Sequence, residues 1–311
     1  MTLCIAAICN KGEAIVAIAD DKVSYQGLYI CFKRKLVELG EQCNALLAGN
    51  LDLQSLIVVK VRKKIADHNA IIPYEPTTKQ FAEFFTRAWQ EVRDEEVERR
   101  ILDHYLISPE VWRLNRQSLD PETIQTVREE INELELPGVQ TIIAGVDHLT
   151  DEDIVARLYL VTGNKIEDRT DLGFVCIGDA AIHAMVEFAQ SRYSPDWYIT
   201  DVAEIVYRAK RRGEVDNMVG KGAVLSYLIE EESRFVTDKM YEGYDELLEK
   251  NYQRIITAEA RAKLIGLLER IRYVRDCRRR SIGGTTEKQS EETTPAKQKK
   301  RSARPRRTKS E

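Results

Sequence analysis

Two short apolar runs at the N-terminus constrain the fold more than any other feature of the chain. Residues 3–9 and 14–19 contain no charged side chain and show no alternation of polar and apolar residues, and Asn10-Lys11-Gly12 between them is a turn signal. The pattern predicts a β-hairpin that is buried on both faces. Because an antiparallel sheet is covered on both faces only between other layers, we expect this hairpin at the centre of a larger domain.

The remaining elements follow in clusters of strands and helices. Capping signals mark several helix starts, namely Thr77-x-x-Gln80, Ser108-Pro109 and Asp120-Pro121. The expected order is a strand pair (28–39 and 43–48), two helices starting near 51 and 78, an inserted pair of helices (106–136), strands (139–146, 156–161 and 174–177), helices (179–193 and 199–212), a strand (223–229) and two helices (240–253 and 258–276). This clustering predicts an α+β fold, a four-layer α/β/β/α sandwich of two antiparallel sheets flanked by helices.

Charge divides the chain into an acidic body and a basic tail. Residues 278–311 hold 12 Lys and Arg against 4 Asp and Glu, so a tail of +8 and a body (1–277) of −12 make up the formal charge of −4. The tail has few large apolar side chains and we expect it to be disordered. It either contacts nucleic acid through phosphates or only aids solubility, and the lack of aromatic residues favours the second reading.

Composition excludes several classes of protein. No run reaches the ~18 apolar residues of a membrane helix, and the N-terminus lacks the basic flank of a secretory signal, so we expect a cytoplasmic protein without membrane contact. The six cysteines form no Cys-x-x-Cys pair, and the four histidines are scattered. We therefore expect reduced structural thiols, no metal site, no cofactor and no Ser-His-Asp triad.

Thr2 is the strongest candidate for a catalytic residue. Loss of Met1, which is usual ahead of a small residue, would leave a Thr with a free α-amine. A Thr hydroxyl is a poor nucleophile until a base takes its proton, and an α-amine with a pKa near ~7.7–8.0 can be that base. The alternative is that Thr2 only begins a buried strand.

An ordered set of short segments supports the catalytic reading. The segments are Thr2 to Cys9, Ala17-Ile18-Ala19-Asp20, Phe32-Lys33-Arg34-Lys35-Leu36, Ala45 to Asn50, Val139 to Asp147 and Ile177-Gly178-Asp179-Ala180. In order and roughly in spacing they resemble the proteasome β-subunits, including those of bacterial type, which are N-terminal-nucleophile hydrolases. The resemblance covers about residues 2–230, apart from the 106–136 insertion.

The resemblance implies a role for each matching residue. Thr2 falls on the nucleophile, Lys35 on the lysine that lowers the pKa of the threonine system, and Asp20 on the carboxylate that pairs with this lysine. A cation beside the α-amine favours the neutral amine, and a carboxylate offsets the cost of burying that cation. Alternatively, Lys35 is a solvated strand lysine and Asp20 a turn residue. The remaining matches are Ser24 (contact with the substrate backbone), the amide of Leu46 (oxyanion donor) and Asp216 (supporting aspartate).

Two departures from the family pattern weaken the catalytic assignment. Asp179 stands where the family has a serine after Ile-Gly, and Val219 replaces the serine that follows the supporting aspartate. Val219 cannot hydrogen-bond the α-amine. Asp179 could replace one contact with a charge, but a carboxylate beside the amine favours the ammonium form and weakens the base.

The sequence thus predicts a proteasome-like threonine hydrolase that cleaves peptides or small amides. The alternative is a catalytically inactive scaffold or adaptor subunit of the same fold. The helix expected at 179–193 carries more apolar positions than one buried stripe needs, so we expect a homo-oligomer. An unfoldase partner would fit a compartmentalised protease.

Overall fold

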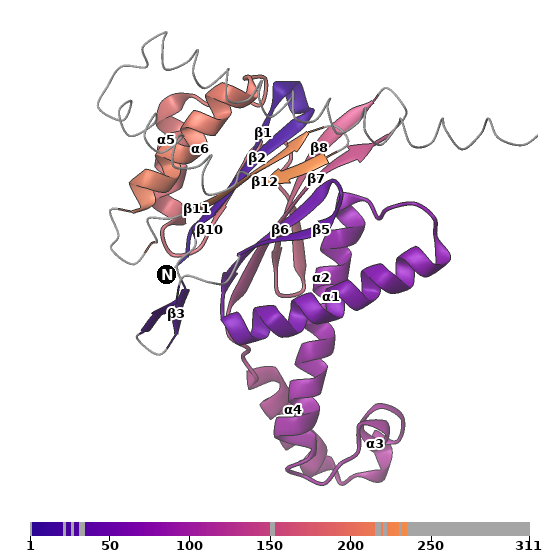
Figure 1. The fold of residues 1–311 in the computed structure, drawn as a ribbon. Coiled ribbons are helices and arrows are strands. Elements are labelled where there is room, and N and C mark those ends of the chain that lie inside the picture. The colour runs from indigo at the N-terminus through magenta and orange to yellow at the C-terminus, as the bar shows by residue number, and fades with distance from the viewer. Residues whose placement is uncertain are drawn as a thin grey trace, which may run out of the picture. The chain divides into compact units, whose positions relative to one another are not determined.

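The computed structural model describes residues 2–20, 23–25, 28–30, 35–149, 153–214, 219, 223–229 and 232–235. These residues belong to one compact unit, Met1–Ile255. The unit has a mixed α+β fold with two five-stranded antiparallel sheets, helices and a separate two-stranded ribbon (Figure 1). The expectation of an α+β fold with two antiparallel sheets is confirmed.

The first sheet is built around the predicted hairpin. Its order is β10 (Phe174–Ile177), β1 (Cys4–Cys9), β2 (Ala14–Asp20), β11 (Ala223–Ile229) and β12 (Glu232–Phe235). Every residue of β1 and β2 is buried, as the two unbroken apolar runs predict. A short turn joins them, in which Asn10, Lys11 and Gly12 all have positive φ.

The second sheet has the order β5 (Leu36–Gly40), β6 (Cys43–Gly49), β7 (Val139–His148), β8 (Ile154–Thr162) and β9 (Lys165–Asp168). The prediction of one continuous strand over 28–39 is wrong. Its first part, β4 (Leu28–Ile30), pairs with β3 (Val23–Tyr25) in the two-stranded ribbon, and only β5 pairs with β6. The apolar pattern identifies both pieces as strands but does not show which partner each one takes.

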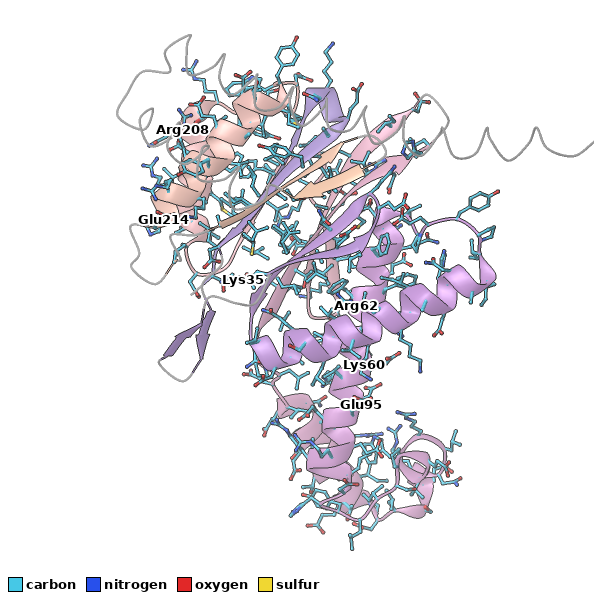
Figure 2. The ribbon with its side chains drawn as sticks, viewed as in Figure 1. Lys35, Lys60, Arg62, Glu95, Arg208 and Glu214 are labelled. Atoms are coloured by element: carbon cyan, nitrogen blue, oxygen red, sulfur yellow. The ribbon has the colours of Figure 1, made fainter. Side chains whose placement is uncertain are left out.

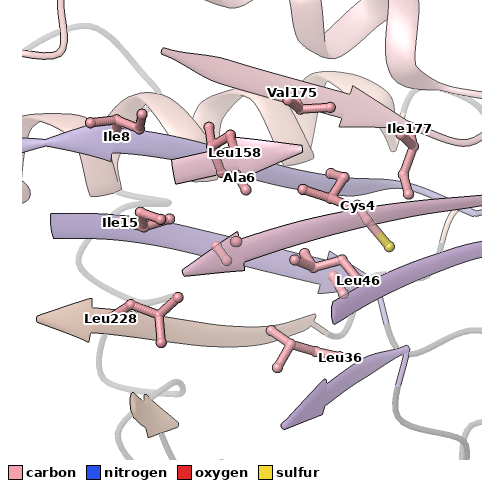
Figure 3. Packing of buried hydrophobic residues seen from close by; sticks show 14 of the residues in the cluster. Cys4, Ala6, Ile8, Ile15, Leu36, Leu46, Leu158, Val175, Ile177 and Leu228 are labelled. Atoms are coloured by element: carbon pink, nitrogen blue, oxygen red, sulfur yellow. The ribbon is translucent and has the colours of Figure 1, made fainter. Parts of the chain in front are cut away.

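Apolar side chains of both sheets meet in one core. Cys4, Ala6 and Ile8 of β1 contribute to it together with Leu46 of β6 and Leu158 of β8. Figure 3 shows these side chains lying between strands of the two sheets. The alternate residues of β1 are equally buried, because α5 (Ala181–Ser191) and α6 (Ile199–Gly213) contact this strand.

Two long helices contact the second sheet. α1 (Leu51–Ile71) and α2 (Thr78–Val97) share a second apolar cluster with β5, β6, β7 and β8. Asn50 caps α1 by accepting a hydrogen bond from Leu53 N–H, and Thr77 with Gln80 forms the predicted capping box of α2. The junction between β6 and α1 is therefore held in place by both packing and capping.

The expected insertion continues from the end of α2. It comprises a π-helical turn (Glu98–Leu102), α3 (Pro109–Leu114), a 3-10 turn (Arg116–Ser118) and α4 (Pro121–Glu133). Ser108 and Asp120 cap α3 and α4 as predicted. The segment has a small apolar core of its own around Val127, and Figure 1 shows it beyond the end of α2, away from the sheets.

The helices expected at 240–253 and 258–276 and the basic tail lie outside the described residues. Among the described helices, none combines the length and the apolar character needed to cross a membrane.

Phe188 provides a test of how α5 is attached to the first sheet. Its ring is fully buried and stacks on Phe174 of β10, with 4.2 Å between ring centroids. We expect Phe188→Ala to lower the free energy of unfolding by about 3–5 kcal/mol, because it leaves a cavity beside β10. His183→Ala, at an exposed position of α5, should change it by less than ~0.5 kcal/mol. Chemical denaturation measures both, and equal effects would contradict this packing.

Candidate active site

Asp20 lies at the end of β2 and binds the residue that follows Thr2. Its Oδ1 accepts a hydrogen bond from Leu3 N–H at 3.0 Å, and its own N–H donates to the Leu3 carbonyl at 3.0 Å. The Asp20 side chain is completely buried. These two bonds extend the β1–β2 pairing by one residue and hold the backbone directly behind Thr2.

Lys35 supplies the cation that Asp20 needs. Its ammonium donates to the same Oδ1 at 2.7 Å, and its side chain is only 6% exposed. The Lys35 carbonyl accepts from Leu47 N–H at 2.8 Å, which fixes the residue at the start of β5. Lys35, labelled in Figure 2, thus shares the Asp20 oxygen with Leu3, the residue directly before β1. Neither alternative reading, a solvated lysine or a turn aspartate, fits a buried ion pair between the two sheets.

Gly178 makes the closest approach to Thr2. A Cβ on Gly178 would lie 2.0 Å from the Thr2 carbonyl oxygen, and its φ of +96° is itself unfavourable for other residues. Only glycine therefore fits at this position. Thr2 itself is half-buried, whereas Leu3 is fully buried. Thr2 thus lies at the boundary between core and solvent.

A second contact joins the two sheets near Thr2. Gly178 N–H donates to the Gln140 side-chain carbonyl at 3.2 Å, and Gln140, the second residue of β7, pairs with Ala48 of β6. Asp179 follows Gly178 in the turn before α5 and is exposed. Gln140 was not predicted as a site residue from the sequence. No local motif marks it, because its role depends on the pairing of β7 with β6.

The expected oxyanion donor, Leu46, lies in the middle of β6 and is fully buried. Leu47 N–H donates to the Lys35 carbonyl. Asn50 N–H donates to the Gly138 carbonyl, which lies on the β7 side. Since successive N–H groups of a strand point in opposite directions, Leu46 N–H points toward β7 and Gly49 N–H toward the Lys35 side. By this alternation the amide of Gly49 lies on the side of β6 that faces Lys35, whereas the amide of Leu46 lies on the β7 side.

Gly49 is constrained as tightly as Gly178. Its φ is +110°, and a Cβ would lie 2.1 Å from the Gly138 carbonyl oxygen. It also ends β6 immediately before the N-cap of α1, where helix amides and the helix dipole favour negative charge. The Gly49-Asn50 pair between a strand and a helix is the sequence signal that could have identified it.

A pocket of 190 Å³ opens beside Lys35. Its lining residues come from the start of β5, from β6 and from the first two turns of α1: Lys35, Val37, Leu47, Leu51, Gln54, Ser55 and Val58. Most of these side chains are apolar. The pocket is therefore suited to hold one side chain of a bound molecule next to the ion pair.

The remaining predicted residues are placed only in part. Ser24 lies on β3 opposite Tyr29 in the two-stranded ribbon, so its substrate contact stays a prediction. Asp216 lies outside the described residues. Val219 is buried, with 4% of its surface exposed, in keeping with its apolar side chain.

The Cys4 thiol lies within the electrostatic influence of Asp20 and Lys35. Its Sγ lies 3.5 Å from the Leu47 carbonyl oxygen and donates to it. Burial raises the pKa of the Cys4 thiol, the Asp20 carboxylate raises it further, and Lys35 acts in the opposite direction. The thiol therefore stays protonated and is a poor nucleophile.

Within the described ranges, no three His, Cys, Asp or Glu side chains gather closely enough to hold a metal ion. Comparison with models of known protein families gives no match to this chain, and comparison with curated proteins gives none either.

The buried ion pair can be tested against an exposed one. Lys35→Met would leave the Asp20 carboxylate buried without its cation, and we expect a loss of about 3–5 kcal/mol in unfolding free energy. The double variant Asp20→Asn/Lys35→Met should recover part of that loss. Lys60→Met removes the surface pair with Glu95, labelled in Figure 2, and should cost less than ~1 kcal/mol. Equal losses from the two single variants, measured by denaturation, would contradict the assignment of a buried pair.

Proposed function

We propose that this chain is an N-terminal threonine hydrolase of the proteasome type that acts on peptide or small amide bonds. The observation that carries the proposal is the single buried oxygen of Asp20, which accepts both the Lys35 ammonium and the Leu3 N–H. This arrangement puts a fixed cation next to the first residues of β1. Such a cation favours the neutral form of an α-amine on Thr2, which is the form that acts as a base.

The arrangement of elements supports the same family. The apolar core between the two sheets, with α1 and α2 packed on one sheet and α5 and α6 on the other, is compatible with the four-layer α/β/β/α sandwich of N-terminal-nucleophile hydrolases. In that architecture the nucleophile begins a central strand of one sheet. Thr2 has this position ahead of β1.

The proposed reaction needs only groups of this chain and water. Thr2 Oγ1 attacks the amide carbonyl carbon while the α-amine takes the hydroxyl proton, and the carbonyl oxygen becomes an oxyanion that accepts from Gly49 N–H. Collapse of the tetrahedral intermediate breaks the C–N bond, and the amine's proton passes to the leaving nitrogen. Water then cleaves the Thr2 ester and restores the hydroxyl. The chemistry requires that Thr2 is the first residue of the mature protein.

A second candidate function is an inactive scaffold or adaptor subunit of the same fold. Asp179 and Val219 favour it, because Val219 is apolar and buried and Asp179 is a carboxylate in the turn after Gly178. Neither residue supplies the hydroxyl that the family uses there. The intact Asp20–Lys35 pair favours the enzyme.

Covalent labelling separates the two functions. Treatment with a β-lactone, which acylates catalytic Thr hydroxyls, should add one label per chain to Thr2 in protein that lacks Met1. Thr2→Ala and Lys35→Met should abolish or strongly slow labelling, whereas Lys60→Met should label like the unsubstituted chain. Intact-mass spectrometry and peptide mapping provide the measurement. Retention of Met1 in the native host, or a label on another residue, would remove the catalytic proposal.

Assembly into a homo-oligomer is part of the same proposal. Ile182, Met185 and Val186 are exposed on one side of α5, with exposed fractions of 68%, 43% and 38%. We expect light scattering to report a mass several times that of one chain. Ile182→Lys should reduce that mass, whereas Val59→Lys at a similarly exposed position of α1 should not. A monomer at all concentrations would contradict the assembly.

A further inference from the structure

Gln54 is a buried polar side chain that the mechanism above does not use. It lies on the second turn of α1, only 6% of its surface is exposed, and it lines the pocket beside Lys35. Among the described residues, its side-chain amide forms no hydrogen bond, and its polar atoms are not sealed from solvent but open to the pocket that Gln54 lines. Its backbone N–H donates to the Asn50 carbonyl. Any group that fills this pocket therefore meets an amide that needs both a donor and an acceptor.

The other walls of the pocket determine which groups can meet that need. Val37, Leu47, Leu51 and Val58 are apolar and offer no hydrogen bond from their side chains. Among the described residues that line the pocket, Lys35 is the only cation, and its charge is balanced by Asp20 at 2.7 Å. A charged group in the pocket would lose its hydration. It would not find an opposite charge there that is still free to pair with it.

We propose that this pocket selects a substrate residue with a neutral side chain that ends in an amide, and that Gln54 is the specificity-determining residue. The inference rests on the proposed function, because it assigns the selected residue to the acyl side of the bond that Thr2 attacks. An amide end can both donate to and accept from the Gln54 amide, and its methylene groups contact the apolar walls. A side chain without a polar end leaves the Gln54 amide unpaired.

Gln, Met and Glu side chains form a matched set for testing this selection, since they have similar length and volume. Gln satisfies the Gln54 amide and Met buries it unpaired. Glu brings a charge that loses its hydration, and as an acceptor it leaves the carbonyl oxygen of the Gln54 amide without a donor. We expect Gln to be preferred over Met and over Glu by about tenfold or more in affinity. A purely apolar pocket would prefer Met.

The experiment measures binding on the full chain with Thr2→Ala, so that no turnover is needed. Blocked tripeptide amides that differ only in a C-terminal Gln, Met or Glu are titrated by calorimetry or by NMR. Gln54→Met should reverse the order of the Gln and Met peptides. Gln125→Met on exposed α4, where the Gln bonds Glu129, should leave the order unchanged.

Each outcome tests the selection separately from the hydrolase activity. A Gln preference that Gln54→Met removes supports the inference, even if a β-lactone fails to label Thr2 and the hydrolase proposal is lost. Equal affinities, a Met preference, or no binding of the Gln peptide at about 1 mM would overturn it, even if Thr2 is labelled. The comparison of the three peptides on the unsubstituted pocket does not depend on whether Gln54→Met folds.

Discussion

One carboxylate oxygen organises the N-terminal end of this protein. Asp20 Oδ1 accepts from Leu3 N–H in the first sheet and from Lys35 at the edge of the second. Burying a carboxylate without hydrogen-bond or charge partners costs much free energy, so the buried Asp20 carboxylate depends on both of these bonds. The pair therefore ties the two sheets together at the position where Thr2 leaves the core, and the geometry of the candidate site depends on it.

The apolar core gives that ion pair a rigid frame. Alternate residues of β1 pack against the second sheet while the intervening residues pack beneath α5 and α6. Two glycines then permit close backbone approach at the same end, Gly178 to Thr2 and Gly49 to Gly138. The polar groups of the site are thus held by closely packed, buried strands.

Much of this arrangement could be predicted from local patterns. The unbroken apolar runs identified β1 and β2, and capping residues such as Thr77, Ser108 and Asp120 identified the helix starts. Thr2, Asp20 and Lys35 were selected by their order along the chain, and Asp20 and Lys35 do meet. Leu46 was predicted as the oxyanion donor without knowledge of the direction of its N–H. That direction depends on the pairing register of the strand, which a single sequence does not show.

The sequence by itself determined the central hairpin, the α+β class and the candidate nucleophile, because burial on both faces and a Thr at position 2 are local properties. Only the tertiary structure decided which amide faces the ion pair, which glycine touches Thr2, and that Gln54 is buried without a partner beside Lys35. Those facts depend on contacts between strands and helices that are far apart in the chain. The secondary-structure propensities of single segments do not indicate such contacts.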